Sequence, residues 1–507
     1  MLQTAHRGNN HELFDGMAPS LRNLSQKVSQ MRPKAACLRR RSLVHSSWDS
    51  DAGPTDLLPL STILGKPPQG SDAEPEALVV VSVARSPPSL MPLPPNSLGP
   101  NLISHISTFS SPSAIPSSLQ GEILANRHLI DHFDQILSEH LTIHIHGTVN
   151  QFREYVLPLA YQHRGILHAL LGLSACHFRL SGKSKNQQFV ALSLRYRSSA
   201  LHYLGSLVSN EEISGLTTSE EEYALVMIFL LVLHDVCETG VSSHGVRLTG
   251  VAFLCKRLAC PTNSSTRSKT SMFLISALAW LDVLRSFSSV EKLAYSEDVR
   301  KCVRDHGSLS LHTLVGCPPV IFHRIGRVFN AAKSYLGGDL PLDRFQVLLD
   351  EAEKFFRSWD PDQAVYPTGN QEWKQLAEAY RHACLLRIIR LPGHFTVPRE
   401  DPRIRASVSA ILDVCADIHR DSAFYKRLLF PLFLAGAETS SPHQLHYANS
   451  CIDEIKHLTG FPHPAMTKLL TKIWEERRTN TNAFPLTAIN LQAFSELLHS
   501  QQSFLFF

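Results

Sequence analysis

Apolar residues recur at helical spacing through most of the chain, from about residue 123 to about residue 480. Residues 151–180 and 189–208 are clear examples, with apolar positions every third or fourth residue and polar positions between them. We expect Pro158 to break or kink the first of these helices near its middle, because proline lacks an amide hydrogen and clashes with the preceding turn. In the second helix, the residues predicted to face inward are Leu192, Tyr196, Ala200, Tyr203 and Leu204.

The stretch TTSEEEYALVMIFLLVLHDV, residues 217–236, predicts a helix that is buried on all sides. Its first residues combine Thr and Ser, which cap helix N-termini, with glutamates that suit the positive end of the helix dipole. The following run, ALVMIFLLVL, is apolar on every face, as in a central helix. This run is well short of the roughly 18–20 residues needed to cross a bilayer. We therefore expect a core helix and no membrane span.

Further segments with helical spacing follow along the chain. They are residues 271–287, 343–359, 372–391, 403–420, 428–439, 445–460 and 464–478. No segment has the sustained alternation that is typical of a half-buried strand. The sequence therefore predicts an all-α fold, in which one large helical domain covers residues 121–507 and is stabilised by packing its amphipathic helices against buried ones.

Residues 1–120 have a different composition. Residues 51–120 alone hold 13 of the 30 prolines, together with many serines. Proline removes backbone donors and fixes φ, so this region cannot sustain helices or inner strands. We expect residues 1–120 to form a disordered basic arm and a Pro/Ser-rich linker.

The charge of the chain is concentrated in this arm. The whole chain carries a net charge of only +4, which does not indicate nucleic-acid binding by the protein as a whole. Residues 1–50, however, hold eight Lys and Arg residues against three Asp and Glu residues. The candidate site here is a basic cluster consisting of Arg32, Lys34, Arg39, Arg40 and Arg41. This basic cluster could engage a nuclear-import receptor, contact phosphates, or be an incidental solvated run.

The cysteines point to a reducing environment. The chain has ten, scattered and often beside apolar residues, and no two are separated by just two residues. This pattern is typical of reduced, buried thiols and excludes a Cys-x-x-Cys metal or redox pair. The N-terminal residues also lack the apolar core of a secretory signal. We expect a soluble intracellular protein.

Three short motifs resemble chemical sites but lack residues that such sites need. Residues 181–185, SGKSK, resemble the end of a phosphate-binding loop, but His177 stands where that loop needs glycine. His140, His144 and His146 could approach one another, yet no cysteine or carboxylate pair lies close by to complete a zinc site. Residues 172–176, GLSAC, lack the second glycine of a nucleophile elbow. We therefore assign no catalytic, cofactor-binding or metal-binding residue, and predict that the protein is not an enzyme.

Several of the predicted helices resemble, in order and spacing, the fungal-specific transcription factor domain, the large helical regulatory region of binuclear zinc-cluster regulators. Departures from the family pattern occur at His244, Arg247 and Val251, which stand where the family has Trp, His and Ala. The segments that carry the resemblance are Leu157–Ala160, His168–His177, the helix with Tyr196, Ala200, Leu201 and Leu204, then Ala279–Ser288, Leu428–Thr439 and Leu469–Arg478.

The resemblance implies a nuclear transcriptional regulator that controls a metabolic or secondary-metabolite pathway. Its partners would be other transcription factors or coregulators, a small-molecule effector and a second copy of the chain, with no membrane and no cofactor. In the family, six cysteines hold two zinc ions in an attached DNA-binding module. Here Cys37 precedes an Arg-Arg-Arg run, but the next cysteine is Cys176, and one thiolate cannot hold the metals. We therefore expect DNA contact to be indirect, or to need a DNA-binding module that an error in the gene model has removed from this sequence.

Two other functions remain open from the sequence. A helical ligand-binding or scaffold protein that acts outside transcription would have the same pattern of amphipathic helices. A helical enzyme whose site is not recognisable by motif is the third reading, and the sequence offers no aspartate-rich helix pair of the kind that terpene-synthase-like chemistry needs.

Overall fold

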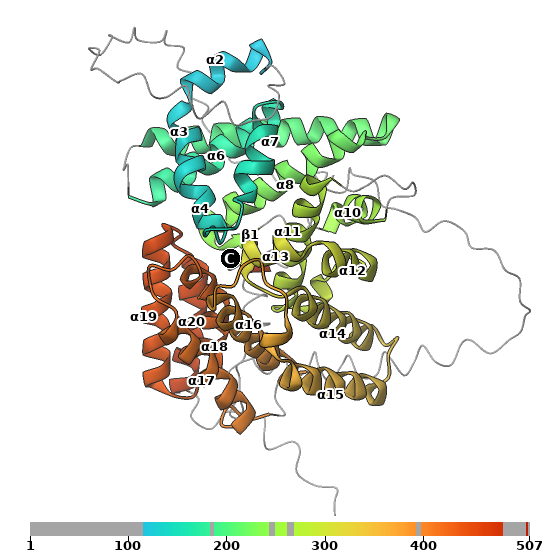
Figure 1. Cartoon of the computed structure of the whole chain (residues 1–507), viewed down its shortest axis with the longest axis vertical. Coiled ribbons are helices and arrows are strands. Elements are labelled where there is room, and N and C mark those ends of the chain that lie inside the picture. The colour runs from blue at the N-terminus through green and yellow to red at the C-terminus, as the bar shows by residue number, and fades with distance from the viewer. Residues whose placement is uncertain are drawn as a thin grey trace, which may run out of the picture.

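The computed structural model describes residues 115–182, 187–242, 249–260, 268–391, 397–479 and 503–504. These residues form a multi-helix assembly, which confirms the predicted all-α fold (Figure 1). One short antiparallel pairing joins β1 (Val241–Ser242) to β2 (Ser503–Phe504). Residues 1–114 lie outside the described residues, so the disordered arm and its basic cluster stay predictions.

The N-terminal helices form one end of the molecule, at the top of Figure 1. There α6 packs against both α7 and α8. Of the five residues predicted to face inward on α7, Tyr196, Ala200 and Leu204 are buried, and Leu192 and Tyr203 pack against the core while partly exposed. The elements are α2 (Ser117–Ala125), α3 (Arg127–His132), the π-helix η5 (Phe133–Leu137), α4 (Ser138–Leu141), the π-helix η6 (Phe152–Val156), α5 (Leu157–Ala160), α6 (Arg164–Leu180), α7 (Gln187–Ser214) and α8 (Thr218–Thr239).

The central helix α8 begins and ends as its sequence indicates. The Thr217 hydroxyl accepts a hydrogen bond from the Glu220 amide, and the Glu220 carboxylate accepts one from the Thr217 amide, which makes a capping box. Gly240 ends the helix with φ of 73°, a left-handed conformation that glycine adopts without strain. All residues from Ala224 to Cys237 are buried, so the predicted core helix is confirmed.

The interruption expected at Pro158 lies a few residues later. Pro158 is the second residue of α5, and the helical backbone passes through it without a break. The chain breaks instead between Ala160 and Arg164, where His163 has extended backbone angles. The π-helix η6 before Pro158 continues directly into α5.

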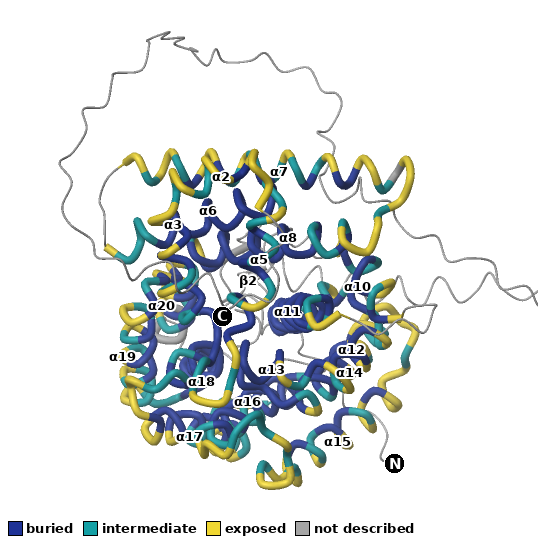
Figure 2. The backbone as a smooth tube through the Cα atoms, turned by 45° about the horizontal axis from the view of Figure 1, so that its top comes forward, coloured by how far each residue is buried: buried dark blue, intermediate teal, exposed yellow. Residues whose placement is uncertain are grey.

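The middle of the chain is organised around α11, which Figure 2 shows end-on and which is buried from Phe273 to Ser286. Ser268 caps this helix by accepting a hydrogen bond from the Ser271 amide at 2.9 Å. Later in this part of the chain, α14 packs against both α12 and α15. The elements are α10 (Ala252–Ala259), α11 (Lys269–Ser286), the 3-10 helix η7 (Val290–Lys292), α12 (Glu297–His306), α13 (Ser308–Val315), α14 (Pro319–Gly337) and α15 (Leu342–Ser358).

The C-terminal part of the chain completes the assembly and contacts the first helices. Lys426 Nζ donates to the Glu139 carbonyl, and Arg427 donates to the His140 carbonyl at 2.8 Å, so both side chains cap the end of α4. The elements are η8 (Pro361–Gln363), α16 (Glu372–Ile389), α17 (Pro402–Asp417), η9 (Tyr425–Leu428), α18 (Leu429–Glu438), α19 (Pro442–Thr459) and α20 (Pro464–Thr479).

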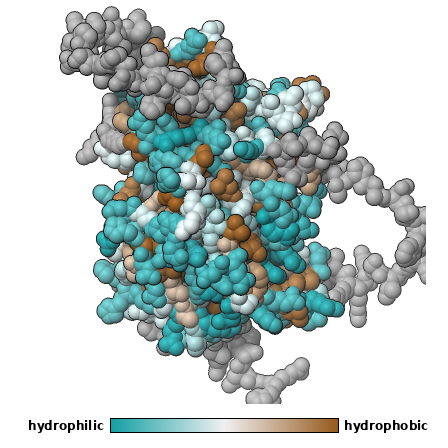
Figure 3. Space-filling model, viewed as in Figure 1, coloured by the Kyte–Doolittle hydropathy of each residue, from teal (hydrophilic) through white to brown (hydrophobic). Residues whose placement is uncertain are grey.

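The face of the molecule seen in Figure 3 is largely hydrophilic, with small and separated hydrophobic patches. Among the described residues, no helix combines the length and the apolar composition that a membrane span requires. The described cysteines are all free thiols, and they are buried with one exception, the exposed Cys260. The expectation of buried thiols was therefore wrong for Cys260, which follows the last turn of α10 beside solvent.

Candidate functional site

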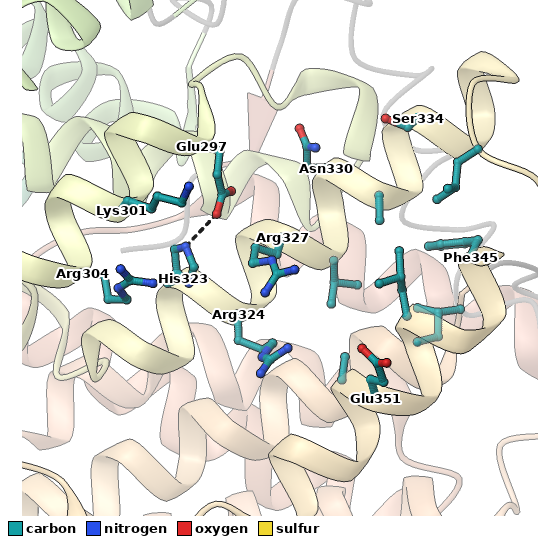
Figure 4. A pocket seen from close by; sticks show the side chains of 16 residues that line it. Glu297, Lys301, Arg304, His323, Arg324, Arg327, Asn330, Ser334, Phe345 and Glu351 are labelled. Carbon is teal, nitrogen blue, oxygen red and sulfur yellow. Dashed lines mark hydrogen bonds and ion pairs between the residues drawn. The ribbon is translucent and has the colours of Figure 1, made fainter. Parts of the chain in front are cut away.

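A groove of about 600 Å³ opens between α12, α14 and α15 (Figure 4). One of its halves is polar and basic and the other is apolar. The lining residues are Glu297, Lys301, Arg304, His323, Arg324, Arg327, Val328, Asn330, Ala331, Ser334, Leu340, Phe345, Leu348, Leu349, Glu351 and Ala352.

Buried anchors fix the two helices that form the basic half. Asp282 on α11 accepts hydrogen bonds from the amides of Ala294 and Tyr295, which hold the approach to α12. The fully buried Arg300 donates to the Tyr295 carbonyl at 2.5 Å and to Glu297 at 3.0 Å. Its side chain lies against Gly326 of α14, where a Cβ atom would come within 2.6 Å of Arg300 Cδ. Glycine at this position therefore allows α12 and α14 to approach closely.

Glu297 and His323 join α12 to α14 at the polar end. His323 Nε2 lies 2.7 Å from Glu297 Oε1, while the other oxygen of Glu297 accepts from Arg300. Burial lowers the pKa of His323, against the opposing effect of the Glu297 carboxylate. Ser334, the hydroxyl that lines the groove, lies eleven residues along α14, about 16 Å away at 1.5 Å per residue. The pair is thus too far from Ser334 to activate it as a nucleophile.

Four cations and two carboxylates line the groove, so its charge is positive. Arg304 is held by Asp305 at 2.7 Å, and Arg324 lies over the Phe355 ring at 4.5 Å. Within the part of the chain that the structure describes, Lys301 and Arg327 make no hydrogen bond or ion pair, and both are exposed. These two side chains are available to an anionic partner.

The apolar half lies where α14 turns into α15. Phe345 is buried and stacks on Tyr335, with ring centroids 5.0 Å apart and an interplanar angle of 17°. Leu349 and Ala352 continue the buried side of α15 along the groove, and Val328 faces them from α14. A ligand with an apolar body could bury that body here while its charged end reaches the basic half.

The motifs singled out in the sequence have structural roles in the described residues. His177 Nδ1 accepts from His132 Nε2 in a buried contact at 2.9 Å, and His177 Nε2 donates to the Thr459 carbonyl at 2.7 Å. His144 pairs with Glu139 at 3.0 Å, and residues 172–176 lie within α6. No group of three or more His, Cys, Asp or Glu side chains in the described ranges could hold a metal ion. Residues 183–185 of the SGKSK motif lie outside those ranges.

The model of the fungal specific transcription factor domain matches residues 128–495, which is more than half of the chain. The chain belongs to this family. It is therefore a fungal transcriptional regulator, and its family is one of regulators rather than of enzymes. That role indicates nuclear localisation and interaction with DNA or with coregulators. No curated protein matched the chain, and no solved structure matched it.

Sequence patterns alone did not reveal the groove of this regulator. Its basic residues come from EDVRKCVRDH and HRIGRVFN, where Lys301 and Arg304, and His323 and Arg327, are spaced three or four residues apart. That spacing places each pair on one helix face, but a charged helix face is usually just solvated. The groove forms because the basic faces of α12 and α14 meet, and only the tertiary structure shows that they do.

Proposed function

We propose that this fungal transcription factor controls a metabolic or secondary-metabolite pathway in response to an amphipathic organic anion bound in the groove between α12, α14 and α15. The supporting observation is the placement of Lys301 and Arg327, two unpaired cations, beside an apolar half built around Phe345. A carboxylate or phosphate group would pair with the cations, and an apolar body would cover Val328 and Leu349.

Contact with DNA is proposed to be indirect, or to use a module outside the given sequence. Cys37 is separated from the next cysteine by 138 residues, so the sequence as given holds no set of six thiolates that could bind two zinc ions. The basic cluster of Arg32, Lys34 and Arg39–Arg41 is proposed to serve nuclear entry, with shuttling through the cytoplasm. Any homodimer would use the helical domain.

The first experiment tests the ligand class with three probes that each carry a ten-carbon chain. Decanoate, decanol and decyltrimethylammonium share one apolar body and differ in charge, and each would compete with a fluorescent anilinonaphthalene sulfonate. We expect decanoate to bind about tenfold more tightly than the other two, since two charge pairs supply roughly that difference. The double variant Lys301→Gln/Arg327→Gln should lose this preference and keep its affinity for decanol.

Arg344→Gln is the matched control, because Arg344 is an exposed arginine of α15 outside the groove. This variant should bind all three probes as the wild type does. Equal affinity of the wild type for the three probes would rule out the proposed ligand class.

The second experiment tests regulation in cells. A deletion strain, the double groove variant and the Arg344→Gln strain are compared by transcript profiling across carbon and nitrogen sources. We expect the deletion and the groove variant to change one common set of transcripts that Arg344→Gln leaves alone. A deletion strain with an unchanged profile in every medium would contradict the pathway role.

A further inference from the structure

A second charged site is buried where α16, α18 and the end of α11 meet. Arg390, the residue that follows α16, donates to Glu438 of α18 at 2.5 and 3.2 Å, and to the Val397 carbonyl at 2.5 Å. Arg387 precedes Arg390 by one turn and is only 8% exposed. Within the described part of the chain, the Arg387 guanidinium makes no hydrogen bond or ion pair, and its Nε atom is completely enclosed.

A small cavity adjoins this unpaired cation. Its volume is about 10 Å³, which is about the size that holds one water molecule or one monatomic ion. Phe287, Leu386 and Leu434 form its apolar walls, and Ser288, Arg387, Arg390 and Glu438 supply its polar atoms. The Ser288 hydroxyl donates to the Arg285 carbonyl at 2.7 Å, so its hydrogen is already used.

The charges that line the cavity do not balance, although Asp401 also acts on Arg390 from outside the lining. Two guanidinium groups face one carboxylate, and Arg390 engages that carboxylate directly. An isolated charge held away from water is strongly unfavourable unless a counterion or hydrogen bonds compensate it. Burial lowers the pKa of Arg387 to about 10, so the side chain is still protonated at physiological pH. A water molecule could accept its hydrogen bonds but would leave the net charge in place.

We propose that the cavity binds one chloride-sized monovalent anion, held by the Arg387 guanidinium and balancing the excess charge of the Arg387–Arg390–Glu438 cluster. The small volume excludes polyatomic anions such as sulfate or gluconate, because the cavity holds a single small particle. The anion would join the end of α11 to α16 and α18. This site is separate from the groove between α12, α14 and α15, and shares none of its lining residues.

Thermal unfolding of the full chain tests this proposal. The wild type and Arg387→Met are compared in sodium chloride, bromide and gluconate at equal ionic strength. We expect the wild type to gain about 2 °C in Tm in chloride or bromide relative to gluconate, as for a ligand present above its Kd. Arg387→Met should show no such gain, because a neutral side chain of similar length needs no counterion. The difference between the two proteins in each salt removes general salt effects.

Arg405→Met is the matched control, because Arg405 is an exposed arginine on the neighbouring helix α17. This variant should keep the wild-type gain. The same Tm gain in Arg387→Met, or none in the wild type, would overturn the proposal.

A second measurement requires no variant. Bound chloride broadens the ³⁵Cl NMR line, and we expect the wild-type chain to broaden it and added bromide to reverse the effect. A line width that the protein leaves unchanged would mean that water alone fills the cavity, and the proposal would be wrong.

Discussion

His132 Nε2 lies 2.9 Å from His177 Nδ1, and this buried contact joins α3 to α6. The other nitrogen of His177, Nε2, lies 2.7 Å from the Thr459 carbonyl at the end of α19. A carbonyl only accepts, so Nε2 of His177 carries the hydrogen and Nδ1 accepts from His132. One imidazole thus connects three helices that are far apart in the sequence.

We predict that His177→Ala lowers the free energy of unfolding by about 2–3 kcal/mol, because it leaves the buried donor of His132 and the Thr459 carbonyl without this partner. Urea unfolding followed by circular dichroism measures the change. His457→Ala removes an exposed histidine of α19 and should shift stability by less than about 0.5 kcal/mol. Equal stabilities of the two variants would contradict this role of His177.

Stability should fall below pH 6.5 because buried histidines stay neutral in the fold. Burial lowers the pKa of His234 to about 3 and that of His312 to about 4. In the unfolded chain both take up protons near pH 6.5, so the unfolded state binds more protons between pH 4 and 6.5. At pH 5.5 each histidine removes about 1.4 kcal/mol of stability relative to pH 7.5.

Urea titrations at the two pH values check this prediction. His234→Gln should lose less stability between pH 7.5 and 5.5 than the wild type does, because one titrating group is gone. An unfolding free energy that is the same at both pH values in the wild type would show that these rings protonate in the folded state.

Gly326→Ala should force α12 away from α14. The new Cβ atom would lie 2.6 Å from Arg300 Cδ, and Arg300 is fully buried and hydrogen-bonded. Overpacking of this kind costs about 1–3 kcal/mol. We expect lower stability in urea and weaker decanoate binding, since α12 carries Lys301. Gly121→Ala is the control, because nothing lies within 4 Å of its added methyl group; weaker binding in the control too would point to a general effect of the methyl group.

The basic cluster in the N-terminal arm is tested in living cells. Replacing Arg39–Arg41 by alanine should move a fluorescently tagged chain from the nucleus to the cytoplasm, because import receptors bind clustered cations. Fusing an unrelated import sequence to the variant should restore nuclear fluorescence. Arg7→Ala/Arg22→Ala removes two isolated basic residues of the arm and should leave the distribution unchanged. A triple variant that stays nuclear would assign import to another segment.

Local sequence signals predicted the helices well where capping and apolar patterning agree. The Thr217–Glu220 capping box and the apolar run after it gave α8, and LLFPLFLAGAET gave the fully buried α18. The break near Pro158 was misplaced because the helix changes there from the π-helical η6 to α5 without ending, and apolar spacing does not indicate where a π-helical segment forms.

The two sites could not be predicted in the same way, because each requires several helices to meet. Arg324 and Arg327 line a groove only because α12 and α15 approach α14 through tertiary contacts. Arg387 and Arg390 did leave a trace in the sequence, since CLLRIIRL places two arginines inside an otherwise apolar run. Charged residues in such a run are either exposed at a helix edge or buried with a partner, and periodicity alone does not separate these cases.

The capping of α4 by Lys426 and Arg427 has a consequence for biosynthesis. These side chains follow Glu139 and His140 by 287 residues. At a translation rate of roughly 5–20 residues per second, the first helices wait about 15–60 s for the residues that close their end. During that interval the Glu139 and His140 carbonyls at the end of α4 lack these two donors. The end of α4 therefore reaches its final hydrogen bonding only after residues 426 and 427 have been made.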